Sequence, residues 1–319
     1  MSHPLHVFFL TLVLGVAFLP AAFAESSTVS QSESTSASAP EGSSRITLPQ
    51  VKLENKKFEE NTDITDAKLK ADAGSLSKFS LKFNLSYYGP TLGDLSAKDQ
   101  PNPDGTIGTY ETSLGGAMGA RYRLDPKTSV SMGTGIKAIH PLHGMERFDV
   151  QTPYVSYDKA KRIFDFQTRS SVGASLTTIP NYKNVGQVGA FTYDFSSVYD
   201  LGISRVALGL DASFSIFLYN REYRLTDKSA SRGAVQLFPT LKYNFSDRLS
   251  ANTSTALSWL APRSVSNETV LWNKTISQRL GLGYAFSRDV FIFPYLTLFP
   301  TKLAFDTTTM NVSTVFSIL

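Results

Sequence analysis

Apolar and polar residues alternate along almost the whole chain from residue 78 onward. The segment RVALGLDASFSIFLYN, residues 205–220, shows the pattern clearly, with an apolar side chain at every second position from Val206 to Leu218. Small or polar residues such as Gly209, Asp211 and Ser213 occupy the positions between them. A period of two residues is typical of a β-strand with one apolar and one polar face. The pattern therefore predicts an all-β chain.

The alternation recurs often enough to predict twelve strands. They are expected to begin near residues 78, 109, 128, 148, 162, 187, 203, 233, 249, 270, 290 and 305. Their connections alternate between long and short, and the short ones fall near 125–127, 158–161, 197–202, 246–248 and 287–289. This arrangement predicts an up-and-down antiparallel meander with tight turns at one end and long loops at the other.

Aromatic residues mark both expected ends of the strands. A Tyr-x-apolar fragment followed by turn residues recurs as YRLDPK (122–127), YDFSSV (193–198), YNFSDR (243–248) and YAFSRD (284–289). The long loops are bordered by Tyr87, Tyr88, Tyr219, Trp259 and Trp272. The strands run to roughly 10–15 residues, whereas a tilted membrane strand needs about 9–11 and a soluble strand averages about 5–6. We therefore expect the apolar face to contact lipid, which requires the sheet to close into a barrel.

The region before the first strand divides into three parts. Residues 1–24 contain an apolar stretch that ends in Ala22-Phe23-Ala24, which predicts a secretory signal peptide cleaved after Ala24. Residues 25–77 form a Ser/Thr-rich linker, and its first part is too poor in apolar residues to fold by itself. Residues 62–74 could form a short helix that stops at Gly74. That helix would be a plug, a periplasmic contact or a loosely packed lead-in to the first strand, and we favour the lead-in.

Composition excludes several function classes. The chain of 319 residues has no Cys, so it contains no disulfide, no Cys-ligated metal and no lipid-modified Cys. Its net charge of +4 is spread thinly, without a run of Lys or Arg, which argues against nucleic acid as a partner.

Residues 78–319, together with the signal peptide, resemble a Gram-negative outer-membrane β-barrel protein. The resemblance is carried by the even strand count, the short turns at one end, the long loops at the other and the amphipathic last strand. It implies residence in the outer membrane, outer-membrane lipid around the barrel and insertion by the barrel-assembly machinery. Such proteins usually end in an aromatic residue, whereas this chain ends in Leu319 with Phe316 three positions earlier.

Two segments contain residues that could support chemistry or bind a metal. The segment IHPLHGMERFD (139–149) holds the two histidines His140 and His143, but neither has a Ser two residues away, as the outer-membrane phospholipases would require. Its spacing of His, Glu and Asp matches no known metal motif. Asp94, Asp99 and Asp104 could bind calcium, although a solvated loop is the simpler interpretation. We predict no catalytic residue, metal site or cofactor.

The polar face supplies the candidate pore lining. The alternation directs twelve charged residues toward the lumen: Lys82, Arg121, Arg123, Lys137, Arg169, Arg205, Lys242, Arg279, Glu111, Asp149, Asp165 and Asp211. Lys82, Arg121, Arg123, Arg205, Lys242 and Arg279 are expected nearer the short turns. The excess of basic residues would either attract anions or form ion pairs that fill the barrel.

These observations predict a narrow passive channel for small solutes, with a preference for anions. The alternatives are a closed structural or adhesive barrel that acts through its loops, and a hydrolase at the barrel rim.

Overall fold

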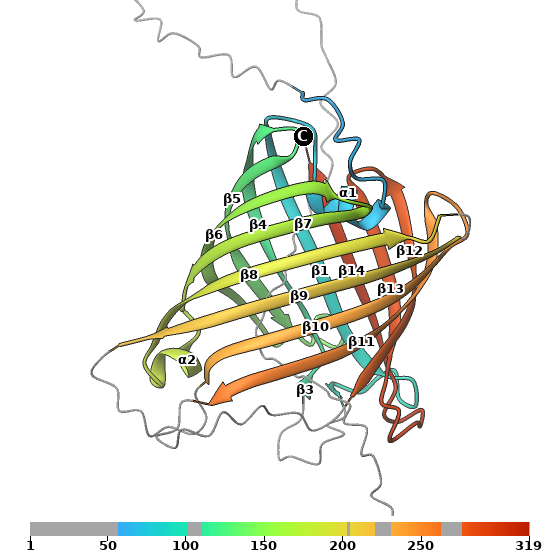
Figure 1. The fold of residues 1–319 in the computed structure, drawn as a ribbon. Coiled ribbons are helices and arrows are strands. Elements are labelled where there is room, and N and C mark those ends of the chain that lie inside the picture. The colour runs from blue at the N-terminus through green and yellow to red at the C-terminus, as the bar shows by residue number, and fades with distance from the viewer. Residues whose placement is uncertain (1–56, 101–109, 203–204, 221–230, 263–275, 319) are drawn as a thin grey trace, which may run out of the picture.

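A closed twelve-stranded antiparallel barrel forms the body of the protein (Figure 1). The computed structural model describes residues 57–100, 110–202, 205–220, 231–262 and 276–318. Each barrel strand pairs with its neighbour in the chain, and β1 closes the ring by pairing with both β4 and β14. The predicted fold class and strand number are confirmed. The signal peptide and the first part of the linker lie outside the described residues.

The strands of the barrel lie close to their predicted positions. They are β1 Phe79–Thr91, β4 Ser113–Asp125, β5 Thr128–Ile139, β6 Arg147–Ile163, β7 Phe166–Leu176, β8 Gln187–Asp200, β9 Val206–Tyr219, β10 Ser231–Asn244, β11 Leu249–Pro262, β12 Ser277–Ser287, β13 Val290–Leu298 and β14 Thr309–Ile318. The two-residue strands β2 (Asp99–Gln100) and β3 (Tyr110–Glu111) form a separate two-stranded sheet. Helix α2 (Pro180–Asn184) lies in the connection between β7 and β8.

Two predicted turns are displaced along the chain. β6 continues to Ile163, through the polar segment 158–161 in which a turn was expected. β8 continues to Asp200, so the fragment at 193–198 lies within a strand and not at its end. In both places the polar residues that suggested a turn lie on strands instead, where alternate positions face the lumen, as Asp158 and Asp194 do.

Short and long connections are segregated at opposite ends of the barrel. The short turns lie at the end of the barrel where β1 begins and β14 ends, along the top and right of Figure 1. The longer connections lie at the other end, together with α2 and the pair β2–β3. We call these the short-turn end and the long-loop end.

The outer surface of the barrel is apolar. Large side chains such as Leu208, Ile216 and Leu282 stand outward and are 47%, 64% and 51% exposed. Aromatic rings form contacts on this surface at the short-turn end, including Phe79 with Tyr122, whose ring centroids lie 5.0 Å apart. Further ring pairs at the same end are Phe166–Tyr199, Tyr243–Phe245 and Tyr284–Phe286. An apolar surface with an aromatic rim is the architecture of an outer-membrane β-barrel. In the described part of the chain, no helix is both long and apolar enough to cross a membrane.

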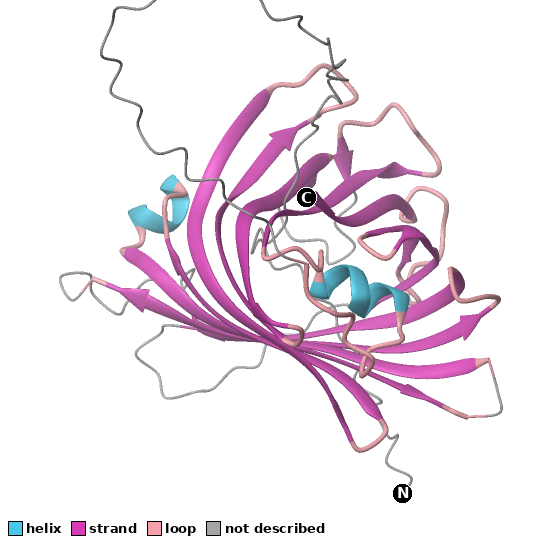
Figure 2. Cartoon of the chain, turned by 90° about the horizontal axis from the view of Figure 1, so that it is seen from above, coloured by secondary structure: helices cyan, strands magenta, loops and turns pink. Residues whose placement is uncertain are grey.

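Helix α1 (Ala67–Ala73) lies inside the barrel at the short-turn end (Figure 2). Asp66 caps its first turn by accepting a hydrogen bond from the Leu69 backbone N–H at 3.0 Å. Gly74 ends the helix at φ +70°, a conformation that favours glycine. A Cβ atom there would also meet the Arg121 guanidinium, which would have to move. The predicted helix is therefore present, but it is a packed plug and not the loosely packed lead-in that we favoured.

Candidate functional site, the barrel lumen

A cavity of about 740 Å³ lies within the barrel. Its walls come from the inward positions of the strands, which are mostly small and polar. Examples are Ser86, Asn252, Ser254, Asn311 and Ser313. Asp66, Lys68, Leu69 and Asp72, from α1 and its cap, contribute to its surface. The volume lies in the range of pockets that hold small organic molecules, about 300–1,000 Å³.

Opposite charges hold α1 to the barrel wall. The Lys242 ammonium of β10 forms an ion pair with Asp66. Lys68 lies 3.2 Å from the Asp211 carboxylate of β9, and Lys82 of β1 donates to the Asp72 carbonyl at 2.6 Å. Burial alone would raise the pKa of Asp66, but the Lys242 ammonium holds it below the ordinary value. Buried charges in a lumen need such partners, because an unpaired charge is costly.

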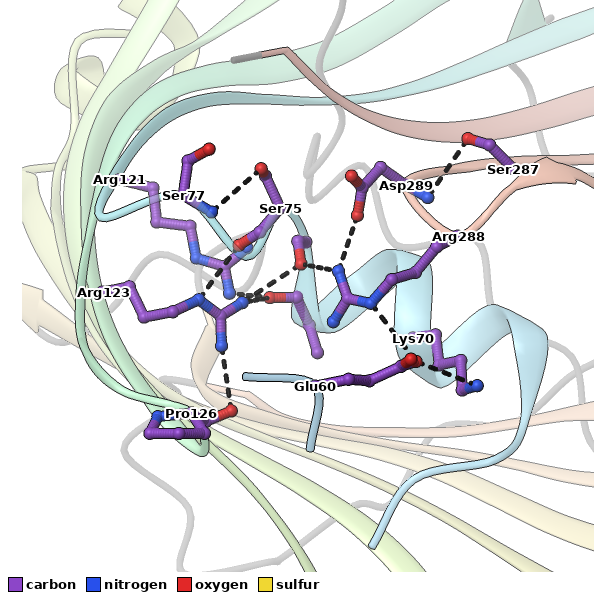
Figure 3. A network of polar contacts seen from close by, with 12 residues as sticks. Glu60, Lys70, Ser75, Ser77, Arg121, Arg123, Pro126, Ser287, Arg288 and Asp289 are labelled. Atoms are coloured by element: carbon purple, nitrogen blue, oxygen red, sulfur yellow. Dashed lines mark hydrogen bonds and ion pairs between the residues drawn. The ribbon is translucent and has the colours of Figure 1, made fainter. Parts of the chain in front are cut away.

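Three arginines bind the carbonyl groups at the end of α1 (Figure 3). Arg123 donates to Ser75 at 2.9 Å, Ala73 at 2.8 Å and Gly74 at 3.1 Å. Arg121 donates to the Ala73 carbonyl, and Arg288 to the Gly74 carbonyl at 2.7 Å. The last carbonyls of a helix have no partner within it and carry partial negative charge, so cations stabilise this end.

The segment before α1 is anchored in the same way. Glu60 lies 3.0 Å from Lys70 and 3.4 Å from Arg288, as Figure 3 shows. Asp63 lies 2.6 Å from Lys127 in the turn between β4 and β5. The fully buried Gln167 accepts hydrogen bonds from the backbone N–H groups of Thr65 and Asp66, at 2.7 and 2.8 Å. Residues 60–75 therefore form one bound unit, which we call the plug.

Apolar contacts on both sides of the plug fix it across the lumen. Ala71 packs against Phe291, Ala285 and Val315 of the wall formed by β12–β14. Leu69 packs in a separate cluster with Ile64 and Ala160, the latter on β6. Both Leu69 and Ala71 are almost completely buried, at 2% and 0% exposed. The plug thus contacts two different walls at the short-turn end.

The structure places most of the predicted lumen residues on the inner face. Those whose side chains line the cavity are Lys82, Glu111, Lys137, Arg169, Asp211, Lys242 and Arg279. Arg121 and Arg123 also point inward, where they contact the end of α1. Arg279 stands only two residues from the start of β12 and so belongs to the long-loop half, not to the short-turn half as expected.

Three of the predicted residues lie elsewhere. Arg205 and Asp165 are exposed residues of the short connections β8–β9 and β6–β7, and neither lines the cavity. Their placement differs from the inward direction that alternation assigned, because β9 begins at Val206 and β6 ends at Ile163. Asp149 lies near the long-loop end of β6, where it pairs with Arg147 at 2.8 Å.

Several charged residues of the lumen were missed by the sequence analysis. Asp158 pairs with Arg169, and Asp194 accepts a hydrogen bond from Ser213 at 2.6 Å. Asp158 fell in the segment expected to be a turn, and Asp194 in the fragment YDFSSV. Their alternation with Ser156 and Ser196, which also line the cavity, was the available signal. Asp66 and Lys68 were missed because the helix was not expected inside the barrel.

The candidate residues of the two loop segments, the two histidines and Asp94, form hydrogen bonds within the loops. His140 Nδ1 lies 2.9 Å from Glu146 Oε2, and His143 Nε2 lies 3.1 Å from the Leu95 carbonyl. Asp94 accepts hydrogen bonds from Ser96, and Asp104 lies outside the described residues. In the part of the chain that the structure describes, no three His, Asp or Glu side chains gather as a metal site.

Comparison with known proteins gives structural likeness only. No protein-family model matches the chain, and no curated protein matches it. Among solved structures, an outer membrane channel from Pseudomonas putida F1 has 10% identity and a TM-score of 0.46, with 77% of this chain and 98% of that chain covered. The NanC porin has 9% identity and a TM-score of 0.41, with 74% and 98% covered. Omp33 of Acinetobacter baumannii has 10% identity and a TM-score of 0.36, with 75% and 98% covered. Likeness at these values assigns no function.

Proposed function

We propose that the protein is a narrow passive channel in the outer membrane of a Gram-negative bacterium, with a preference for small anions. The observation that carries this proposal is the cavity of about 740 Å³, lined by both polar and apolar side chains, inside a closed barrel whose outer face is apolar. In this proposal the signal peptide directs export and is cleaved after Ala24. The barrel-assembly machinery then inserts the strands into outer-membrane lipid.

The plug supports a narrow pathway. Barrels of about eight strands are filled by side chains and those of about sixteen hold an open channel. Twelve strands leave an intermediate lumen, and α1 occupies its short-turn end. Solutes would pass between the plug and the wall, so the plug limits their size.

The proposed preference for anions rests on the cavity cations that neither bind the plug nor form an ion pair. Lys82, Arg121, Arg123 and Lys242 bind the plug, and Arg169 pairs with Asp158. Lys137 and Arg279 also line the cavity, and no carboxylate of the described residues lies within ion-pair distance of either. Glu111 and Asp194 line the cavity as well, and neither forms an ion pair among the described residues. The proposed preference therefore depends on where Lys137 and Arg279 lie along the pathway, because a cation between low-dielectric walls raises the local concentration of anions near it.

Planar-bilayer recording of the purified full-length mature protein tests this proposal. We expect stable unitary currents and, in a salt gradient at low ionic strength, a reversal potential on the anion-selective side. The selectivity should fade near 1 M salt, where the Debye length is about 3 Å. A cation-selective reversal potential would contradict the preference, and complete absence of unitary currents would contradict the channel.

A closed structural or adhesive barrel is the second candidate. It is favoured by the number of ion pairs and hydrogen bonds that fix the plug across the lumen. It predicts silence in the same recording, with loop partners at the long-loop end. The rim hydrolase is the third candidate, and it predicts turnover of lipid or peptide that is lost in His140→Ala.

A further inference from the structure

One arginine of the cavity wall is held by aromatic rings. The Arg279 guanidinium carbon lies 4.8 Å from the centre of the Phe238 ring and 5.5 Å from the centre of the Tyr295 ring. Both distances are within the range of about 6 Å for cation–π attraction. The three residues come from β12, β10 and β13, and all three line the cavity.

Small residues on the neighbouring strands make this arrangement possible. Strand β11 separates Phe238 from Arg279, and its inward residues there are Ser254 and Ala256, which leave the space above it free for longer side chains. On β12, Gly281 pairs with Tyr295. A Cβ atom on Gly281 would clash with the Pro294 carbonyl oxygen of β13, and it would lie 2.6 Å from Tyr295 Cβ and 2.8 Å from Phe293 Cε2. Glycine at this position therefore allows both the backbone and the aromatic side chains of β13 to approach β12 closely.

The rings leave the edge of the guanidinium available. A cation–π contact uses the charge of an arginine, whereas its N–H donors point outward in the plane of the group. Among the described residues, Arg279 forms no ion pair, and its guanidinium contacts these two rings. The other arginines of the lumen differ, because Arg121, Arg123 and Arg169 donate to plug carbonyls or to a carboxylate.

Further aromatic side chains line the cavity. Tyr88, Phe293 and Phe299 line it together with Phe238 and Tyr295. Phe293 stacks on Tyr295, with ring centroids 5.1 Å apart and an angle of 14° between the planes. Phe293 also packs against the cluster around Ala71, so the plug forms the adjoining floor. A ligand in this region would meet one fixed cation among aromatic surfaces.

We propose that this part of the lumen is a binding site for small organic carboxylates that carry a flat ring. The ligand carboxylate would accept two parallel hydrogen bonds from Arg279, and its ring would contact the aromatic wall. The inference rests on the proposed function in one respect, since it names the class of solute that the channel would prefer. The binding itself requires only the cavity.

Equilibrium binding of 4-fluorobenzoate to the folded full-length mature protein in detergent micelles tests the site, with ¹⁹F NMR as the readout and protein-free micelles as the blank. We expect saturable binding to the wild type. Arg279→Gln should weaken it by about tenfold or more, since hydrogen bonds to charged groups are among the stronger ones. Arg279→Lys should retain only part of the affinity, because lysine keeps the charge but lacks the planar fork.

Lys302→Gln is the matched control. It removes one positive charge from an exposed residue in the connection between β13 and β14 that does not line the cavity. We expect its affinity for 4-fluorobenzoate to match the wild type. Folding of every variant is checked by heat-modifiable mobility on gels.

Several outcomes would overturn the proposal. They are no saturable binding to the wild type, equal affinity in folded Arg279→Gln, equal binding of the uncharged 4-fluorobenzyl alcohol, or equally effective competition by acetate, which lacks the ring. Because binding in micelles does not require conduction, the two proposals fail separately. Binding without currents would remove the channel alone, and currents without binding would remove the site alone.

Discussion

At the scale of single residues, the two faces of β9 should respond differently to a charge. Leu210 pairs with Ser197 and Pro239 at mid-strand, and it has the same phase along β9 as the exposed Leu208 and Phe214. Ser213 points inward, where its hydroxyl donates to Asp194 at 2.6 Å. We predict that Leu210→Arg impairs barrel assembly far more than Ser213→Arg. An arginine facing mid-membrane lipid costs roughly 2–4 kcal/mol, whereas an inward one lies near Asp194 and water.

The fraction of heat-modifiable, folded protein on gels measures this difference. Leu210→Ala serves as the control, because it shortens the same side chain without adding charge and should assemble nearly as well as the wild type. Equal folded fractions for Leu210→Arg and Ser213→Arg would contradict the assignment of these faces.

At the scale of elements, docking of the plug should depend on pH. The hydrogen bond from Lys70 lowers the pKa of Glu60, and that from Lys127 lowers the pKa of Asp63. The pKa of Asp66 is lowered as well, by Lys242 against the effect of burial. A carboxylate whose pKa is lower when docked favours docking at neutral pH, and this contribution is lost as the pH falls through its docked pKa.

We therefore predict that the plug stays docked between about pH 5 and 8 and loosens below about pH 4, near the ordinary carboxylate pKa. Amide hydrogen exchange at Leu69 and Ala71, corrected for its intrinsic dependence on pH, should become faster in this acidic range. The amides of the barrel strands should remain protected. Asp66→Asn should show faster exchange already at pH 7, because it removes the partner of Lys242. Exchange in α1 that is constant from pH 7 to 3 would contradict this prediction.

The plug also shows which structural features the sequence could predict. Alternation along a strand is local, so the inward direction of Lys82 and Lys242 could be inferred from neighbouring residues. The helix was also predictable, because Gly74 provides a local stop signal. The partner of Lys242 was not, since Asp66 lies 176 residues earlier and meets it only when the barrel closes around the helix. The ring contacts of Arg279 could not be predicted either, because they join residues of three strands and require the space above Gly281.

At the scale of the whole molecule, the two ends of the lumen differ in chemistry. At the short-turn end, the inward cations are bound to plug carbonyls and carboxylates. Toward the long-loop half, Arg279 stands among aromatic rings and faces the cavity. If the proposed channel is correct, a solute entering from the long loops would meet the aromatic site first and the plug second. The orientation of the barrel in the membrane therefore decides whether a solute from outside the cell meets the aromatic site or the plug first.

We predict that the long-loop end faces the cell exterior and that the plug faces the periplasm. Outer-membrane barrels keep their short turns on the periplasmic side, and the plug and the end of β14 lie at that end here. An epitope tag beside Ser96, next to the exposed Leu95, should bind antibody on intact cells. The same tag beside the exposed Phe164, in the turn between β6 and β7, should bind only after the outer membrane is permeabilised. Folding of both tagged proteins is confirmed by gel mobility, and the opposite labelling pattern would show that the barrel is inserted the other way round.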